Sequence, residues 1–383
     1  MEKSVASVAR GPLGLYLHIP FCDSICNYCN FNRGLREPRL ERRYIQALET
    51  EIGRAGDGTP VDSIYFGGGT PSILAPDDVA SLIQACRSAF DCHGDTEVSF
   101  EVNPETVTPT RAEGWLSAGV TRFSLGVQSL RDEELTRLGR RHSAARAIQA
   151  VGQLRAAGCG NMSVDIMLWL PAQTRDQCRT TVDELLALEL DHASLYLLEL
   201  YPNAPLREDM ARAGWSMAPD DDAAEMYEEA LDVLESSGYQ QYEISNVARS
   251  SHQCRHNLKY WQDGEWLGFG CGAHSTRHDG RWRNVGDTGR YINQVTTGGS
   301  PMAEHHVLST EERVGDMLFT GLRLTDGLDL EAIRIAYGVD VMTRYDEALA
   351  PFLEARLVVH AGGRLRLTRA GMLLANEVMK IFV

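Results

Sequence analysis

The chain has 383 residues, of which 43% are hydrophobic, and its 53 acidic and 37 basic residues give a formal net charge of -16. A chain of this length can bury a large core, and we expect one large domain and a smaller one. The negative field repels phosphate backbones and anionic lipid surfaces, which argues against nucleic acid as a partner. The best candidate for a local basic patch is the sequence LGRRH, with Arg140 and Arg141.

The N-terminal sequence MEKSVASVARGPLG has no apolar export signal, and no run of about 18 apolar residues predicts a membrane span. Nine cysteines is an odd number, and six of them are scattered along the chain. Without a secretion signal, this usage is typical of reduced thiols and not of a disulfide framework. We therefore expect a cytoplasmic protein.

Strand-like and helix-like segments alternate over the first 240 residues. The segments with strand character are 13–19, 62–68, 96–102, 122–128, 162–170 and 192–200, and helical patterns include 40–52, 76–90, 174–190 and 220–238. Six strands that are each followed by a helix predict parallel β/α units with right-handed crossovers. The fold class is therefore α/β, either as a partial (βα)6 TIM-like barrel or as an open, doubly wound sheet.

The remainder of the chain divides into two further parts. Residues 241–304 are rich in Gly, His, Asn and aromatic residues and have weak periodicity, so we expect a barrel extension or linker. Residues 305–383 show two helical patterns and then a hairpin around Gly362 and Gly363. This order predicts a small α+β, winged-helix-like domain, and residues 1–240 are then the barrel domain.

Three cysteines, Cys22, Cys26 and Cys29, lie close together in the sequence HIPFCDSICNYCNFN. A structural zinc site needs four ligands, and His18 could supply the fourth. Buried free thiols are a second alternative, although the segment is a polar loop after Pro20. The third is an iron–sulfur cluster, usually held by four thiolates, which three cysteines would leave with one open iron. Such an iron is a site for an exchangeable ligand.

The spacing C-x3-C-x2-C, followed by GGGTP after the next predicted strand, resembles the radical S-adenosylmethionine (SAM) superfamily. In that family, SAM chelates the open iron of a [4Fe–4S] cluster through its amino and carboxylate groups. The reduced cluster then donates one electron and releases a 5′-deoxyadenosyl radical. The sequences YLHIPFC, EVNPE, FSLGVQS, LGRRH, VDIM and LPAQT resemble the HemN/HemW branch of this superfamily over nearly the whole chain.

The resemblance implies that Cys22, Cys26 and Cys29 hold the cluster, and it also implies SAM-binding positions. Glycines 67–69, followed by Thr70, let backbone groups approach a ligand closely, although a tight β-to-α turn would also use them. Glu101 ends a strand beside the expected site and either holds a ribose hydroxyl or amino group or is a solvated strand end.

Further polar positions match those that contact SAM in the coproporphyrinogen dehydrogenase of this branch, namely Gln128, Arg140 and Asp165, and Tyr16 matches its tyrosine before the cluster. Arg140 could bind a carboxylate in a bidentate fork, or it could be a surface charge next to Arg141. Asp165 lies within an apolar strand, where a carboxylate without a partner is costly. A ligand or an arginine partner is therefore expected for Asp165.

Two features separate members of this branch. The dehydrogenase has an extra cysteine where this chain has Phe31, which argues against porphyrinogen decarboxylation. The sequence HNLKYW supplies His256, Asn257, Tyr260 and Trp261, and it resembles the HNxxYW signature of the haem chaperones of the branch. His256 is then a candidate axial haem ligand, with Cys254 nearby as another conceivable iron ligand. The alternative is a hydrogen-bonded core histidine with aromatic packing.

The chain departs from the pattern at WLPAQT, where the family usually has GLPGQT, so Trp169 and Ala172 replace glycines. We expect the bulky indole of Trp169 to reshape the substrate cavity. The resemblance implies a haem chaperone with a [4Fe–4S] cluster, SAM and haem. A HemN-like methyltransferase that uses two SAM molecules is the alternative, and a coproporphyrinogen oxidase is disfavoured. Expected partners are haem, a haem acceptor, a reductant such as flavodoxin or ferredoxin and, as a possibility, a second copy of the chain.

Overall fold

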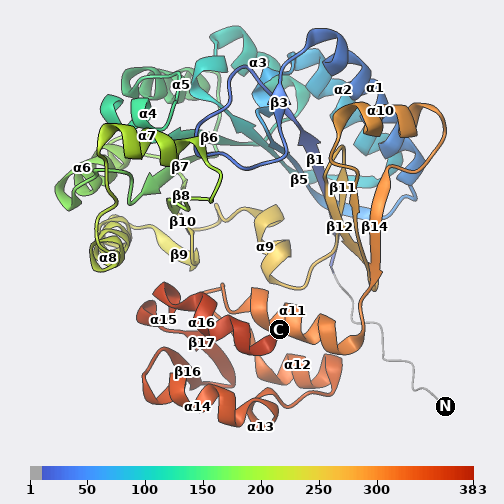
Figure 1. The fold of residues 1–383 in the computed structure, drawn as a ribbon. Helices are drawn as coiled ribbons and strands as arrows, with labels where there is room; N and C mark the ends of the chain where they lie inside the picture. The colour runs from blue at the N-terminus through green and yellow to red at the C-terminus, as the bar shows by residue number, and fades with distance from the viewer. Residues whose placement is uncertain (1–10) are drawn as a thin grey trace, which may run out of the picture.

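The computed structural model describes residues 11–383, and its largest element is a 12-stranded sheet (Figure 1). Six neighbouring parallel strands follow one another in chain order, namely β1 (Leu13–Ile19), β4 (Pro60–Gly68), β5 (Asp91–Val102), β6 (Arg122–Gln128), β7 (Met162–Leu168) and β8 (His192–Leu197). A doubly wound sheet would reverse this order at a switch point. The prediction of a partial (βα)6 barrel is therefore confirmed, and the doubly wound alternative is wrong.

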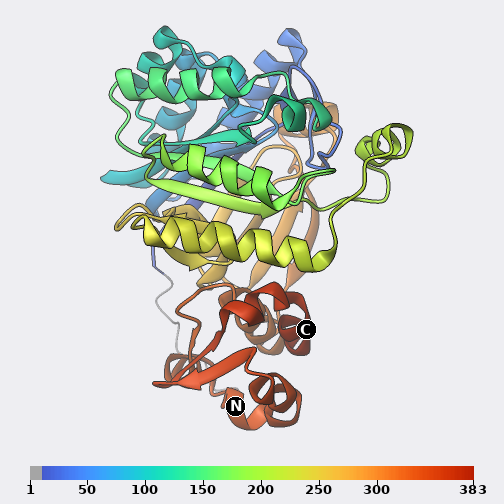
Figure 2. The same ribbon diagram turned by 90° about the vertical axis from the view of Figure 1, so that its left-hand side faces the viewer.

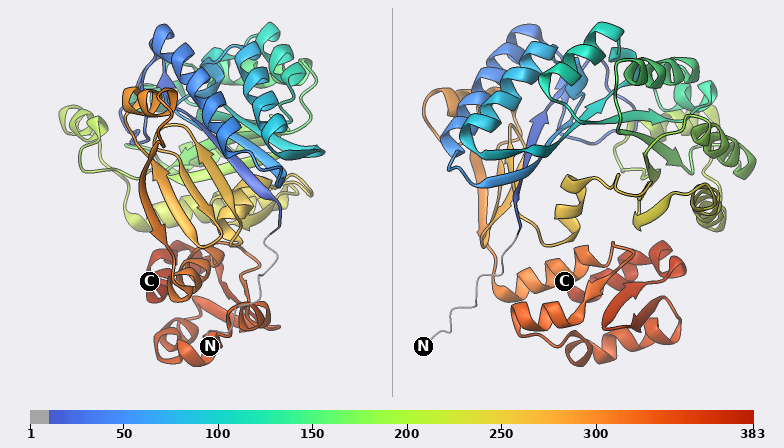
Figure 3. Two further views of the ribbon diagram at one scale, coloured as in Figure 1. Left: turned by 90° about the vertical axis from the view of Figure 1, so that its right-hand side faces the viewer. Right: turned by 180° about the vertical axis from the view of Figure 1, so that it is seen from behind.

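Helices cover the outer face of the curved sheet, as Figure 2 and Figure 3 show from the side and from behind. They are α1 (Pro38–Ala55), α2 (Pro76–Ala89), α3 (Pro109–Ala118), α4 (Asp132–Arg137), α5 (Ala144–Ala156), α6 (Arg175–Leu186) and α8 (Asp220–Ser236), while α7 (Pro205–Ala213) projects near the ends of the strands. Local sequence explains their limits. A capping box between Thr174 and Gln177 begins α6, and Gly238 follows the end of α8 with a φ of 87°.

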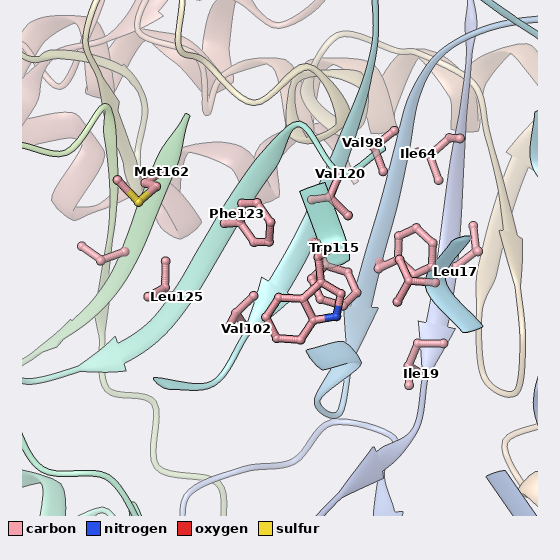
Figure 4. Close-up of a cluster of buried hydrophobic side chains, with 14 of the residues drawn as sticks. Leu17, Ile19, Ile64, Val98, Val102, Trp115, Val120, Phe123, Leu125 and Met162 are labelled. Carbon is pink, nitrogen blue, oxygen red and sulfur yellow. The ribbon is translucent and has the colours of Figure 1, made fainter. Parts of the chain in front are cut away.

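The hydrophobic core lies between the sheet and these helices. Figure 4 shows Leu17, Ile64 and Phe123 of three strands beside Trp115 of α3, and all four side chains are 0% exposed. Because side chains alternate along a strand, the residues between them point to the inner face. That inner face carries polar residues such as Tyr16, Ser63, Glu101 and Asp165, so it does not form an apolar barrel interior.

The segment with weak periodicity folds into regular structure and extends the sheet at both edges. Strands β10 (Asn246–Ala248) and β9 (Gln240–Glu243) follow β8 antiparallel to it. On the other side, β11 (Trp266–Phe269) pairs in parallel with β1, and β12 (His274–Arg277), β13 (Gly280–Asn284) and β14 (Met302–Val307) complete the sheet. Helices α9 (Arg255–Trp261) and α10 (Thr288–Thr296) lie between these strands in the chain. Strands of three to six residues are too short to show a clear hydrophobic period.

A second hydrophobic core lies in the C-terminal part, which forms an α+β domain with a three-stranded sheet of order β15-β17-β16. Its elements are α11 (Thr310–Gly321), β15 (Leu328–Asp329), α12 (Leu330–Tyr337), α13 (Val341–Arg344), α14 (Asp346–Glu354), β16 (Val358–Ala361), β17 (Arg364–Leu367), α15 (Arg369–Leu373), α16 (Ala375–Met379) and the 3-10 helix η3 (Lys380–Phe382). The predicted hairpin is confirmed, because Gly362 and Gly363 connect β16 to β17 with φ of 60° and 75°.

Short elements complete the fold near the ends of the parallel strands. They are β2 (Phe21–Cys22), β3 (Gly34–Leu35) and the 3-10 helices η1 (Pro71–Ile73) and η2 (Pro104–Thr106). Within residues 11–383, no helix combines the length and the apolar character that crossing a membrane requires.

Candidate functional site

The three-cysteine loop follows β1 at the carboxyl ends of the parallel strands. Cys22 ends β2, which pairs in parallel with β3, and the backbone N–H of Cys29 donates to the carbonyl of Cys26 over 3.2 Å. The Thr70 hydroxyl donates to the Cys22 sulfur over 3.4 Å, and Nη1 of Arg140 donates to the Cys26 sulfur over 3.5 Å. The structure therefore brings two predicted SAM-site residues against two predicted cluster ligands.

The three thiols lie close enough to influence one another but do not converge on one point. Burial raises the pKa of Cys22 and of Cys29, and in both cases the neighbouring loop thiols raise the pKa further. A zinc ion with Zn–S bonds of about 2.3 Å would bring its sulfur ligands to about 4 Å from one another. No group of three Cys, His, Asp or Glu residues within residues 11–383 has an arrangement suited to one metal ion. Three thiolates are also the donor set that leaves one iron of a [4Fe–4S] cluster open.

His18, the fourth ligand of the zinc alternative, is engaged elsewhere. Its Nδ1 lies 3.1 Å from the Tyr16 hydroxyl, and its Nε2 lies 2.7 Å from the carbonyl oxygen of Asn32. The ring is 6% exposed, and burial lowers its pKa. Because both ring nitrogens have partners, His18 positions the loop and does not complete a tetrahedral site.

The glycine loop packs tightly against the chain itself. A Cβ on Gly67 would lie 2.9 Å from the Tyr16 ring, and one on Gly68, where φ is 115°, would lie 2.5 Å from the His18 ring. A Cβ on Gly69 would lie 2.8 Å from the carbonyl oxygen of Phe21. Local packing is thus a sufficient reason for the three glycines, as the turn alternative expected. The same packing places the loop beside the cysteines.

Glu101 is held at this loop and is not a solvated strand end. Its carboxylate accepts a hydrogen bond from the Tyr65 hydroxyl over 2.8 Å and one from the backbone N–H of Gly68 over 3.2 Å. Burial raises its pKa to about 7, although both hydrogen bonds act in the opposite direction. A carboxyl group that titrates near neutral pH can accept or donate a proton in hydrogen bonds with a ligand.

Asp165 and Gln128 line the same inner face. The Ser124 hydroxyl donates to Asp165 over 3.3 Å, and burial raises the pKa of this carboxyl group. Gln128 ends β6 with a left-handed φ of 69°, and it makes no side-chain hydrogen bond in the part of the chain that the structure describes. A non-glycine residue in this conformation is uncommon and is found where function constrains the backbone.

The prediction that Arg140 belongs to a basic surface patch with Arg141 is wrong. Its Nη2 donates to Asn103 over 2.9 Å and to the Gly126 carbonyl over 2.8 Å, so the guanidinium points into the site and not into solvent. Asn103 also donates to Thr70 over 3.2 Å and therefore links two site residues. Sequence reasoning missed Asn103 as a site residue, although it lies within the quoted motif EVNPE.

His256 lies on the inner face at the opposite end of the strands. Its Nδ1 lies 3.1 Å from the Ser63 hydroxyl, its Nε2 lies 2.9 Å from the Tyr260 hydroxyl, and its ring stacks on Tyr65 with centroids 5.2 Å apart. The side chain is 0% exposed, and burial, with a smaller effect of Lys259, lowers its pKa to about 3. This geometry favours the alternative of a hydrogen-bonded core histidine over an axial haem ligand. Cys254 is likewise 0% exposed.

The far end of the HNxxYW helix, α9, contacts the C-terminal domain. The Arg323 guanidinium lies 4.4 Å from the centre of the Trp261 ring and pairs with the buried carboxylate of Glu243 over 2.9 Å. Arg313 pairs with Asp263, two residues after the helix, over 3.0 Å. The motif therefore joins the inner face of the barrel to the second domain.

The expectation that Trp169 reshapes the cavity is wrong in this structure. Trp169 follows β7 with a φ of 58°, its indole nitrogen donates to the Ala218 carbonyl over 2.9 Å, and its ring packs against the main core. Ser163, Asp165 and Met167 alternate onto the inner face, and regular alternation would put Trp169 there too. The left-handed backbone conformation at Trp169 turns its side chain away from that face. Ala172 has a φ of 55°, so both positions keep the conformation that glycine favours.

Comparisons with known proteins agree with this geometry. Residues 16–185 match the Radical SAM superfamily, and residues 308–374 match the HemN C-terminal domain. The solved structure of the coproporphyrinogen III oxidase HemN from Escherichia coli has a TM-score of 0.86 over 99% of this chain and 91% of that chain, at 23% identity. This likeness concerns the fold. The barrel, the cysteine loop and the C-terminal domain define a radical SAM protein.

Relatives of similar length narrow the assignment. The proteins named Heme chaperone HemW are 33% identical in Bacillus subtilis, over 96% of this chain and 98% of the relative, and 35% identical in Mycobacterium tuberculosis, over 98% and 96%. The chain belongs to the HemW family within the HemN/HemW branch. The mitochondrial radical S-adenosyl methionine domain-containing protein 1 of Bos taurus is 38% identical over 80% of this chain and 67% of the relative. The predicted resemblance is confirmed.

Proposed function

We propose that this protein is a haem chaperone that binds a [4Fe–4S] cluster, SAM and haem, and delivers haem to an acceptor protein. The observation that carries the proposal is the relationship to proteins named Heme chaperone HemW over nearly the full length. The three-thiol loop without a fourth cysteine ligand supports the cluster and SAM. The acidic net charge of -16 supports a protein or small-molecule partner over nucleic acid.

Cys22, Cys26 and Cys29 would hold the cluster, since thiolates are its usual ligands. The cluster, when bound and reduced, supplies the electron that cleaves the sulfonium of SAM. The chain's own residues orient the thiolates, because Thr70 and Arg140 donate hydrogen bonds to two of the sulfurs. Donors to sulfur and nearby positive charge tune the potential of such clusters.

SAM would bind between the glycine loop and the ends of β5 to β7. Glu101 and Asp165 are carboxyl groups with raised pKa, which suits hydrogen bonds to hydroxyl and amino groups of a ligand. Gln128 contributes an amide that has no side-chain partner among residues 11–383, and Tyr16 lies beside this site and stacks on Tyr65 with ring centres 6.1 Å apart. Arg140 is the cation for the SAM carboxylate in this proposal.

The test is a haemin titration of anaerobically reconstituted protein, with the Soret band and the stoichiometry as readouts, combined with SAM binding by calorimetry. We expect about one haemin per chain, and SAM binding that requires the cluster. A Cys26→Ser variant should lose SAM binding, whereas Cys178→Ser, which alters a buried thiol in α6, should retain it. If haemin fails to bind stoichiometrically to the reconstituted protein, the chaperone proposal is wrong.

Analysis of SAM products tests the methyltransferase alternative. S-Adenosylhomocysteine together with methylthioadenosine would support methyl transfer, whereas 5′-deoxyadenosine alone shows only radical formation. Trp169, which we expected to reshape the substrate cavity, packs its indole on the core and gives this alternative no support. Phe31, at the position of the dehydrogenase cysteine, is 65% exposed and offers no metal ligand.

The proposed function needs a reductant that contacts the cluster loop. It also needs a reducing compartment. A reductant such as flavodoxin or ferredoxin must approach the loop, where the apolar side chains of Ile25, Phe31 and Leu35 are exposed. All nine cysteines are free thiols, which suits the cytoplasm. Sedimentation with and without SAM tests the possible homodimer.

A further inference from the structure

Haem binding, as proposed above, needs a side chain that reaches the iron, and the buried histidines do not offer one. The buried histidines are His18, His142, His192 and His256, and each is at most 6% exposed. Both ring nitrogens of each lie within 3.3 Å of a protein oxygen. An iron ligand needs a free nitrogen lone pair that faces the ligand. The exposed histidines are therefore the remaining candidates for the iron ligand.

Three exposed histidines make no side-chain hydrogen bond or ion pair with another residue of the described chain, namely His274, His305 and His360. The ring of His305 lies near Trp282, with centroids 6.3 Å apart, and Trp282 packs against the main core on the outer side of the sheet. His360 lies in β16 of the C-terminal domain, far along the chain from the site. Only His274 begins a strand next to the cysteine loop.

The position of His274 follows from the turn that precedes β12. Asn32, three residues after Cys29, donates to the backbone carbonyls of Cys271 and Gly286 over 3.1 Å each, so residues 271–273 are tied to the cysteine loop. The Trp266 indole nitrogen donates to the backbone carbonyl of His274 over 3.1 Å. The backbone of His274 therefore lies between the turn that is tied to the cysteine loop and the indole of Trp266.

Strand register places His274 on the inner face of the sheet. Trp266 pairs with Thr276, and its ring packs edge-on against Tyr260 of α9 at 4.7 Å between centres. Since side chains alternate, His274 shares this face with Thr276 and Trp266. Its cross-strand neighbour is Arg283, and the neighbour of Thr276 is Arg281.

The two arginines supply positive charge on the same face. Their side chains remain 48% exposed at Arg283 and 41% exposed at Arg281, although they pair with Glu304 and Asp316. Burial lowers the pKa of His274, with Arg283 acting in the same direction and Glu304 in the opposite one, and the net shift favours the neutral imidazole. A neutral imidazole is the form that binds metal.

We propose that His274 supplies the axial imidazole for haem, with Trp266 against the macrocycle and Arg281 and Arg283 facing the propionates. The proposal rests on the proposed haem-chaperone function. Haem has an iron with open axial positions, a flat apolar ring and two carboxylates. The proposal assigns a group on the inner face to each of these parts of haem. The imidazole nitrogen donates its lone pair to iron, and no bond of the protein breaks.

The test compares haemin titrations of wild type, His274→Ala, His256→Gln and His360→Ala in the reconstituted full-length protein. We expect the Soret maximum of the His274→Ala complex to shift and its affinity to fall about tenfold or more. Added imidazole should restore the wild-type spectrum, because it replaces the missing ligand. His360→Ala, an exposed histidine in the second domain, and His256→Gln should bind haemin with the wild-type spectrum.

The outcomes separate this inference from the function on which it rests. If wild type and His274→Ala give the same Soret band and affinity, the axial assignment is wrong and the chaperone proposal stands. If His256→Gln, with wild-type circular dichroism, loses the wild-type spectrum while His274→Ala retains it, the ligand is His256. If wild type binds no haemin, both proposals fail. Arg283→Gln should weaken haemin binding without changing the Soret maximum, since it contacts no iron.

Discussion

The two ends of the polar inner face use their side chains in different ways. At the end beneath α9, His256 and His192 each use both ring nitrogens, with Ser63 and Tyr260 for the first and Ser163 and Tyr242 for the second. At the cluster end, Gln128 has no side-chain partner among residues 11–383, and Nε of Arg140 is buried without one. Saturated buried groups stabilise a fold, whereas unsaturated ones are costly unless a ligand completes them. We call the cluster end the open end and the end beneath α9 the saturated end after these side chains, although Nε of Arg122 and the indole nitrogen of Trp261, beneath α9, are also buried without a partner.

The largest expected effect is on cofactor content at the open end. Cys26→Ser removes one of three thiolates, so the reconstituted protein should lose nearly all cluster iron and sulfide, because serine is a poor ligand for iron–sulfur clusters. Iron and acid-labile sulfide assays measure this loss. Cys86→Ser, in a buried thiol of α2, is the matched control and should retain the cluster. A full cluster in the Cys26 variant would contradict the assignment.

The next largest effect is on stability at the saturated end. His256→Ala leaves the hydroxyls of Ser63 and Tyr260 without their partner and opens a cavity beside Tyr65, so we expect a loss of about 3 to 4 kcal/mol in the free energy of unfolding. Urea denaturation of the protein without cluster measures it. His256→Gln can bond one of the two hydroxyls and should recover part of the loss. A loss below about 1 kcal/mol would show that this end is not a structural core.

Glu101 lies at the glycine loop of the cluster end, and its bond to Tyr65, whose ring stacks on His256, links it to the other end. We expect it to connect stability to pH. Its folded pKa of about 7 exceeds the ordinary value of 4.5, so its contribution to stability is present below about pH 4.5 and is lost as the pH rises to about 7. Glu101→Gln should therefore be more stable than wild type by about 2 to 3 kcal/mol at pH 8 and nearly equal at pH 4. Thermal unfolding at both pH values tests this difference. We also expect weaker SAM binding, which would mark a functional cost of the substitution.

The smallest effect should come from Trp169→Gly. Glycine relieves the left-handed φ of 58° but removes the hydrogen bond to Ala218 and the packing of the ring. These contributions oppose each other, so we expect the free energy of unfolding to change by about 1 kcal/mol or less. Haemin and SAM affinities should be unchanged, since the indole faces the core. A changed Soret band in this variant would contradict this assignment and show that Trp169 lines the haem site.

The six parallel strands and their helices could be predicted because each combines a buried apolar face with clear end signals. The positions of β1 and β6 agree with the predicted segments 13–19 and 122–128 at both ends. The short strands from β9 to β13 were missed, since their stability comes from pairing with distant strands and not from local pattern. At the site, motif spacing identified Arg140, but only three-dimensional contacts could show Asn103 beside it, or both nitrogens of His256 engaged.

The pairing of β11 with β1 has a consequence for synthesis on the ribosome. β1 is the first long strand to emerge, yet one of its edges is completed only when Trp266 pairs with Gly14. Until then the nascent chain presents an unpaired strand edge beside the cysteine loop, and such edges invite aggregation. Native contacts this distant in sequence also slow folding. Most of the chain must therefore be synthesised before β11 can pair with this edge of β1. The three thiols leave the ribosome long before β11 does.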